Sequence, residues 1–184
     1  MKDHGDVAVA TPDLHRWERR FFLGSNQPVF VRPVTASDDS LIRDLFAHMS
    51  IQDRRLRFFE AIKEISPPLM SKLTAIDYSR SIAFVAANES NGDALGIVRL
   101  HGDTAGRSAE FAIAIRSDHQ GRGLGWRMMQ LMIEYAGSMK LEFIQGQVLE
   151  QNEAMLMLCK KLGFRISLNM HEAGLRDVCL HLAG

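Results

Sequence analysis

The stretch that decides the fold is residues 113–125, which read Ile113-Ala114-Ile115-Arg116-Ser117-Asp118-His119-Gln120-Gly121-Arg122-Gly123-Leu124-Gly125. Residues that suit a strand come first, and three glycines come last, directly before an apolar pattern of helical spacing. Glycines let the backbone approach a ligand closely, and the N–H groups at the start of a helix attract anions. Residues 120–125 therefore predict an anion-binding loop, although the same residue types also make a plain strand-to-helix connection.

Two common phosphate-binding loops do not fit residues 120–125. A Rossmann loop opens a parallel strand–helix–strand unit, whereas this loop comes late in the chain and follows strands with hairpin-type connections. A Walker A loop ends in Gly-Lys followed by Ser or Thr, and here Trp126 follows Gly125. Binding of ATP by these glycines is disfavoured, because the chain also lacks a magnesium-ligand pattern.

Hydrophobic periodicity divides the chain into strands and helices. Strands are predicted at residues 29–34, 81–87, 94–100, 109–115, 141–149, 164–170 and 177–182. Helices are predicted from residue 37 onward, over 51–62, after residue 68, and over 124–137 and 152–162. The Asn91-Gly92 pair indicates a hairpin, so we expect residues 81–115 to form an antiparallel meander of three strands.

The N-terminal 27 residues have no regular apolar period. We expect residues 1 to about 13 to form a loose tail. The mixed aromatic and charged segment from Trp17 to Phe22 is interpreted as a strap that covers the core, with a partner surface as the alternative.

Composition excludes several classes of protein. The chain has 184 residues, 46% of them hydrophobic and 24% charged, as is typical of one soluble domain. Its 22 basic and 22 acidic residues give no net field to attract nucleic acid or an anionic membrane. Two cysteines and seven histidines without ligand spacing predict neither a disulfide framework nor a metal site. With no membrane span or signal core, a cytoplasmic location is expected.

Two spaced motifs carry a family resemblance. Gln120-Gly121-Arg122-Gly123-Leu124-Gly125 matches the Q/R-x-x-G-x-G/A signature of the GNAT acyltransferases. Asn152-Glu153-Ala154, followed by Leu162-Gly163-Phe164, resembles the next signature of that superfamily. The resemblance implies an acyltransferase domain at residues 28–184 with an N-terminal extension at residues 1–27. It further implies an α/β (α+β) fold, in which about four helices flank a mixed, mostly antiparallel sheet of six to seven strands.

A narrower resemblance is to the acyltransferase domain of bacterial protein lysine acetyltransferases. It rests on Arg32-Pro33, Arg57-Phe58-Phe59, Ile76-Asp77-Tyr78 and Ala109-Glu110-Phe111-Ala112. It implies acetyl-CoA as cosubstrate and a protein lysine as acceptor, with acyl-CoA synthetases as one class of acceptor protein. A second, non-catalytic hypothesis is an acyl-CoA-sensing or interaction module that keeps the loop without turnover.

The resemblance also assigns the cofactor residues. It places the CoA pyrophosphate on the backbone of residues 120–125 and the cofactor arm against Asn152. It implies a strand bulge near Ala114 and Ile115, where the N–H groups of residues 113–115 would serve the thioester carbonyl and the pantetheine arm. Many members carry a tyrosine seven residues after the asparagine, to protonate the leaving thiolate. Here that residue is Cys159, a weak hydrogen-bonding group that we interpret first as core or pocket lining.

Glu110 is the candidate general base. Acyl transfer from a thioester to an amine needs no covalent nucleophile, but the ammonium proton must leave. On a strand, Glu110 shares a face with Ala112 and Ala114, which leaves room for a thin ligand, while Phe111 points to the other face. The alternative is an ordinary solvated carboxylate.

Two further features lie in the N-terminal helical region that, by the resemblance, walls the acceptor side. Tyr78 is interpreted either as part of a substrate groove or as core. For the Arg54-Arg55-Leu56-Arg57 run, the favoured interpretation is a solvated helix face.

Overall fold

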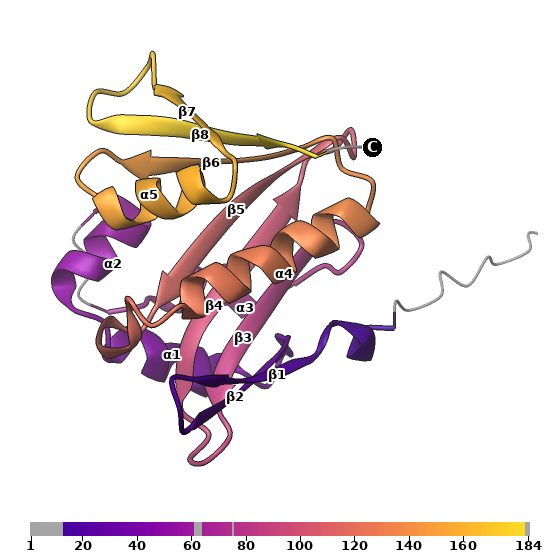
Figure 1. Ribbon diagram of the computed structural model, residues 1–184, viewed down its shortest axis with the longest axis vertical. Helices are drawn as coiled ribbons and strands as arrows, with labels where there is room; N and C mark the ends of the chain where they lie inside the picture. Colours follow the sequence, from indigo (N-terminus) through magenta and orange to yellow (C-terminus); the bar gives the residue numbers. More distant parts are fainter. Residues whose placement is uncertain (1–12, 61–63, 75, 183–184) are drawn as a thin grey trace, which may run out of the picture.

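Eight strands form one sheet in the order β1-β2-β3-β4-β5-β6-β8-β7 in the computed structural model (Figure 1). The structure describes residues 13–60, 64–74 and 76–182. Neighbouring strands are antiparallel except β5 and β6, which are parallel. The strands are β1 (Arg19–Leu23), β2 (Gln27–Pro33), β3 (Ser81–Asn88), β4 (Ala94–Gly102), β5 (Ser108–Ile115), β6 (Phe143–Leu149), β7 (Arg165–Leu168) and β8 (Leu175–His181).

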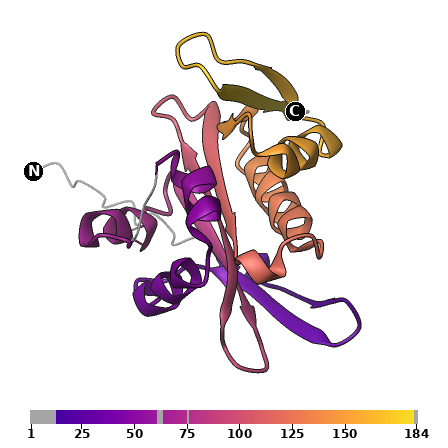
Figure 2. The same ribbon diagram turned by 90° about the vertical axis from the view of Figure 1, so that its left-hand side faces the viewer.

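In the described part of the chain, five α-helices cover the sheet, with α1, α2 and α3 on one face and α4 and α5 on the other (Figure 2). They are α1 (Asp39–Ala47), α2 (Ile51–Phe58) and α3 (Pro67–Thr74), then α4 (Leu124–Ser138) and α5 (Glu153–Lys161). Each face has its own apolar core. Phe84 of β3 is buried in one core with Met128 and Met132 of α4, whereas Ile42 and Phe46 of α1 are buried in the core on the opposite face. Two 3₁₀ turns, η1 (His15–Trp17) and η2 (Ser117–His119), complete the described elements.

The central strands are apolar on both faces because helices cover both. Residues 82–86 of β3 are all buried, so the strand reads as a continuous apolar run rather than an alternating one. The predicted meander of β3, β4 and β5 is confirmed by the antiparallel registers, and Gly92 in the first turn has a φ of 80°.

The predicted fold class is confirmed. The described residues form eight strands where six to seven were expected, and five α-helices where about four were expected. The additional strand is β1, which pairs with β2 and brings residues 19–23 into the sheet. Trp17 packs edge-on against Tyr135 of α4 at a centroid distance of 5.0 Å, so it covers the core as expected. The predicted tail falls almost wholly outside the described residues, and the domain boundary at residue 28 stays a prediction.

Two local expectations need correction. The helix predicted over 51–62 ends at Phe58, and Phe59 adopts the left-handed conformation with a φ of 65°; residues 61–63 lie outside the described part. The bulge expected near Ala114 and Ile115 is absent from the pairing of β5 with β4, which is regular from residue 109 to 115. The ladder instead shifts on β3, between Ala86 and Ala87.

The feature that creates the site is the early separation of β5 from β6. Only Ser108, Ala109 and Glu110 of β5 have partners on β6, although β5 continues to Ile115 and β6 to Leu149. The two strands diverge beyond that point (Figure 1). Their edges therefore face an opening rather than each other.

No helix among the described residues is long and apolar enough to span a bilayer.

Candidate active site

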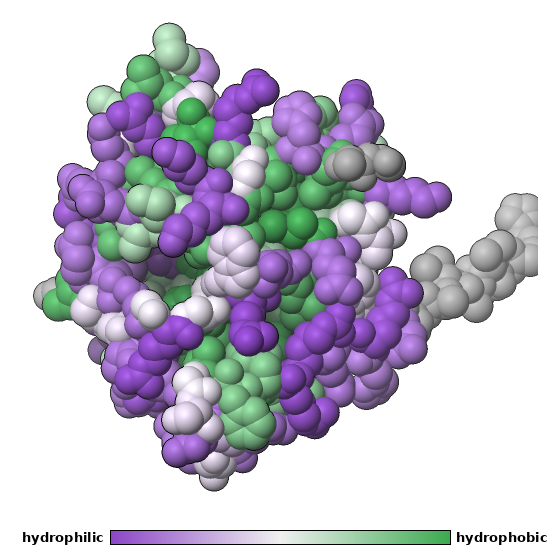
Figure 3. Space-filling view, in the orientation of Figure 1, coloured by the Kyte–Doolittle hydropathy of each residue, from purple (hydrophilic) through white to green (hydrophobic). Residues whose placement is uncertain are grey.

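A cavity of about 770 Å³ occupies the opening between β5 and β6. The surface is hollowed between the start of α4 and α5, with apolar residues exposed nearby (Figure 3). Residues from α2, β5, the loop before α4, β6 and α5 line the cavity. The expected site residues among them are Glu110, Ile113, Ala114, Ile115, Gln120, Gly121, Gly123, Gly125 and Asn152.

The glycine loop ends in an uncapped helix start at the cavity. Gly123 is the N-cap residue of α4, and no side chain caps the helix or places an acidic group in its first turn. Gly121 and Gly123 have φ angles of 72° and 88°, which L-residues with a side chain rarely adopt. Nothing lies within 4 Å of a Cβ at either position, so the loop is open to a ligand. The free N–H groups of the first turn and the helix dipole together suit an anion.

The same loop is tied to the helix on the other side of the cavity. The backbone N–H of Ser50 donates to Ser117 Oγ at 2.8 Å, and Ser117 Oγ in turn donates to Asp53. Ser50 is also the N-cap of α2, because its hydroxyl accepts from Asp53 N at 3.0 Å. These bonds hold α2 against the loop. They therefore fix the spacing between the anion-binding end and the wall formed by α2.

Glu110 lies where β5 and β6 separate. It is the last residue of β5 that pairs with β6, opposite Gln145, and on its other side it pairs with His101 of β4. Ser81 of β3 continues this row across the sheet and shares a hydrogen bond of 2.6 Å with His101 Nδ1. Glu110 is exposed, and it also lines a second cavity of about 300 Å³ that contains His101 and Ser81. Glu110 therefore lines both cavities.

The two faces of β5 are divided as predicted. Ala114 belongs to the core under α1 and α3, whereas Phe111, Ile113 and Ile115 pack toward α4. Glu110 is four residues from Ala114 on a regular strand, so it shares the α1–α3 face.

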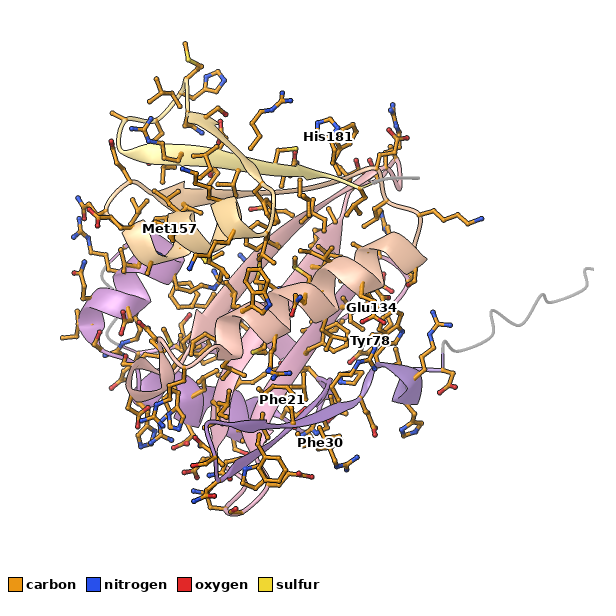
Figure 4. All side chains as sticks on the ribbon, viewed as in Figure 1. Phe21, Phe30, Tyr78, Glu134, Met157 and His181 are labelled. Atoms are coloured by element: carbon orange, nitrogen blue, oxygen red, sulfur yellow. The ribbon has the colours of Figure 1, made fainter. Side chains whose placement is uncertain are left out.

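Four expected residues do not line the cavity, and three of them are Leu124, Arg122 and Tyr78. Leu124 is buried in the core, and Arg122 is exposed on the loop. Tyr78 packs against the core that contains Tyr135 of α4, and it lies away from Met157 on α5 (Figure 4). Burial raises the pKa of the Tyr78 phenol above its usual range, as the core interpretation requires.

Cys159 is fully buried in the core and is likewise absent from the lining of the cavity. Burial raises the pKa of its thiol to about 12. The thiol is therefore protonated at neutral pH and far from the solvent that a reagent needs.

We predict that Cys159 resists alkylation in the folded protein. Iodoacetamide at pH 8 should label the partly exposed Cys179, whereas Cys159 should react only after denaturation. Mass spectrometry of the native and denatured protein measures both sites. Rapid native labelling of Cys159 would contradict the burial and reopen its candidacy as a proton donor.

Sequence reasoning missed the part that α2 plays in the cavity. Asp53, Leu56 and Arg57 all line it, at offsets of three and four residues that place them on one helix face. Arg57 thus corrects the solvated-face interpretation of the arginine run, because its side chain is partly buried. The spacing of three and four residues from Asp53 to Leu56 and Arg57 could have indicated a shared helix face. The run of three arginines suggested a solvated face instead.

Among the described residues, no three His, Cys, Asp or Glu side chains lie close enough together to hold a metal ion.

The family model for the acetyltransferase (GNAT) family matches residues 48–164. The chain belongs to this family. An acetyltransferase of Pseudomonas aeruginosa is 33% identical over 144 residues, which cover 77% of each chain. The acetyltransferase Pat of Mycolicibacterium smegmatis is 27% identical over 73% of this chain, but the match spans only 40% of that longer protein. The L-amino acid N-acyltransferase MnaT of Escherichia coli is 28% identical, over 49% of this chain and 55% of its own length.

Solved structures share the fold of this GNAT chain. The GNAT domain of Streptomyces lividans PAT superposes with a TM-score of 0.84 and 22% identity, over 94% of this chain and 99% of that one. An acetyltransferase of Salmonella typhimurium, solved with its cofactor acetyl-CoA, superposes with a TM-score of 0.65 and 19% identity. That match covers 84% of this chain and 94% of the other.

Proposed function

We propose that this GNAT protein transfers an acetyl group from acetyl-CoA to the ε-amine of a protein lysine by direct attack. The observation that carries the proposal is the position of Glu110, at the separation of β5 from β6 and in the same cavity as the uncapped start of α4. Family membership supplies the reaction class. The resemblance of the sequence to protein lysine acetyltransferases favours a protein acceptor, and acyl-CoA synthetases are the acceptor proteins to test first.

In this proposal, the backbone of residues 120–125 holds the CoA pyrophosphate, because free N–H groups and the helix dipole meet there. The arm then runs between the diverging strands, along Ile113, Ala114 and Ile115 and past Asn152. Beyond Glu110, β5 has no pairing with β6. Its backbone N–H and C=O groups on that side are therefore free to bind the amides of the arm.

The acceptor amine arrives protonated at neutral pH and must lose a proton to attack. Glu110 accepts it, directly or through water, and the second cavity with His101 and Ser81 leads the proton to solvent. The nitrogen then attacks the thioester carbonyl, the C–S bond breaks, and CoA leaves as a thiolate or thiol. The buried Cys159 takes no part in that departure.

Thiol release from acetyl-CoA tests the proposal against a panel of acyl-CoA synthetases, other proteins and small amines. We expect release together with an acetylated lysine in a protein acceptor, located by mass spectrometry. Binding of CoA without release of thiol on any acceptor would support the acyl-CoA-sensing module instead. Acetylation restricted to free amino acids would retain the chemistry and replace the acceptor, in line with the name of the MnaT relative.

Asn152 caps α5 in addition to its proposed contact with the cofactor arm, and substitutions can separate these two roles. Its Oδ1 accepts from Met155 N at 3.2 Å, so it caps α5. We predict that Asn152→Ala lowers the free energy of unfolding by about 1 kcal/mol through loss of the cap. It should also weaken CoA binding by about 0.5 to 1.5 kcal/mol through loss of one hydrogen bond to the arm.

Denaturant unfolding and calorimetry measure the two effects of Asn152 separately. Asn152→Asp is the matched variant, because a carboxylate keeps the cap but cannot donate to the arm. If both variants bind CoA as the wild type does, Asn152 is a helix cap and nothing more.

A further inference from the structure

Arg57 is a partly buried cation without a polar partner in the described part of the chain. Its Nε is buried and has no hydrogen-bond partner, and its guanidinium forms no ion pair with any described residue. Its guanidinium lies over the ring of Phe58, at 4.9 Å from the ring centroid, a contact that provides no carboxylate or carbonyl acceptor. Since buried polar groups are nearly always paired, this arginine requires an explanation.

Packing makes the charge of Arg57 more costly. Burial lowers the pKa of Arg57 to about 10, and the positive charge of Arg99 acts in the same direction, while Glu110 opposes it. Arg99 lies on β4 between Ala83 and Ala112 and donates to the carbonyl of Lys72 near the end of α3. It adds a second positive charge near Arg57. An unpaired cation beside another cation destabilises a fold. Both charges therefore favour an anion at this place.

Arg57 lies on the wall of the cavity. Arg57 lines it with Glu110 and Ala112, on the wall that α2 forms. The proposed pyrophosphate site is at the start of α4, whereas α2 contacts the preceding loop through Asp53, one helical turn before Arg57. An anion bound by Arg57 would therefore lie next to Glu110, the candidate base, and would not be the CoA pyrophosphate.

We propose that Arg57 forms a subsite for a carboxylate that the acceptor carries close to its reactive amine. This inference rests on the proposed N-acetyltransferase function and specifies its acceptor. The planar fork of a guanidinium fits a carboxylate with two parallel hydrogen bonds. Glu110 then receives the amine while Arg57 receives the carboxylate, so the pair is complementary to an acceptor with both groups. The carboxylate comes either from a free amino acid or from an acidic residue beside the target lysine of a polypeptide.

Matched acceptor pairs test the subsite. Free L-amino acids are compared with their amides, and lysine peptides with a neighbouring Asp are compared with the same peptides carrying Asn. We expect kcat/KM to be about ten- to a hundredfold higher for the member with the carboxylate, as charge-assisted bonds of this kind require. The pair that shows the preference identifies the source of the carboxylate.

Arg57→Met removes the charge and keeps an apolar chain of similar length. It should abolish the preference, leave the KM for acetyl-CoA unchanged and leave the thermal midpoint equal or higher, because an unpaired charge is lost. Arg57→Lys keeps the charge without the fork and should restore part of the preference. Arg55→Met is the control, since Arg55 is exposed on the same helix and does not line the cavity. Acetylation without preference in the wild type, or a preference that survives Arg57→Met, overturns the subsite.

A binding measurement separates this inference from the proposed function. N-acetylated amino acids and acetyl-lysine peptides, with their uncharged counterparts, are titrated calorimetrically into protein saturated with CoA. The carboxylate forms should bind about tenfold more tightly or better, and Arg57→Met should remove the difference. If no acceptor is acetylated but this difference persists, the enzymatic proposal fails and the subsite stands. Equal affinities for charged and uncharged probes overturn the subsite whatever the turnover.

Discussion

Gly123→Val is expected to remove the response of the thermal midpoint to CoA. In the wild type, CoA at one hundred times its Kd stabilises the native state by about 2.7 kcal/mol, which corresponds to roughly 5 to 10 °C for a chain of this size. Gly123 has a φ of 88°, a conformation that a β-branched residue cannot adopt without strain. The loop must therefore change its backbone, and the N–H groups at the start of α4 lose their common direction. The shift should fall to zero.

A control is needed because Gly123→Val also strains the folded state. Gly106, in the turn between β4 and β5, has a φ of 68° and nothing within 4 Å of its Cβ position. It lies outside the lining of either cavity described above. Gly106→Val should lower the midpoint of the free protein but retain the full CoA shift. A wild-type midpoint that ignores millimolar CoA and rises with ATP would show that the loop binds a different cofactor.

The sequence was sufficient for the parts of the fold that local chemistry determines. The Asn91-Gly92 pair indicated the hairpin of β3 and β4, in which Gly92 takes the positive φ that glycine accepts readily. Gly121 and Gly123 likewise indicated a backbone that only glycine accepts readily, directly before an apolar helical pattern. The face of β5 that carries Glu110 followed from a period of two residues.

Pairing between distant strands was harder to predict. Nothing in residues 108–115 shows that β5 leaves β6 after Glu110, because the separation depends on how each strand packs under α4 and α5. β1 was missed for a related reason. Its Arg19, Arg20 and exposed Phe22 suit an edge strand, where burial is low and the apolar period is weak.

The site was predicted least well where residues act through burial. In the sequence, Arg57 belongs to a run of arginines that is typical of a solvated helix face. Only the packing of α2 shows that its side chain is partly buried at the cavity. Tyr78 had two interpretations, substrate groove or core, and it packs partly buried against the core and does not line the cavity. Residue type, strand face and the family resemblance thus pointed to the carboxylate on β5 but not to its cationic neighbour.

Glu110→Gln is expected to lower turnover by about 10² to 10⁴ at pH 7 while the affinity for CoA stays unchanged. Glutamine keeps the shape and the hydrogen bonding of the side chain but cannot accept a proton. The proposed CoA site consists of backbone groups at the start of α4, which this substitution does not touch. Glu172→Gln removes an equal charge from the exposed loop before β8 and should leave both quantities as in the wild type.

The dependence of this loss on pH separates proton removal from packing. The amine of lysine has a pKa of about 10.4, so each unit of pH between 7 and 10 raises its neutral fraction roughly tenfold. An amine that arrives neutral has no proton for Glu110 to remove. The ratio of wild-type to Glu110→Gln turnover should therefore shrink as pH rises toward 10, whereas damage to packing would leave it constant. Equal turnover of the two proteins at pH 7 would exclude Glu110 as the base and leave water, with the row of His101 and Ser81, as the route of the proton.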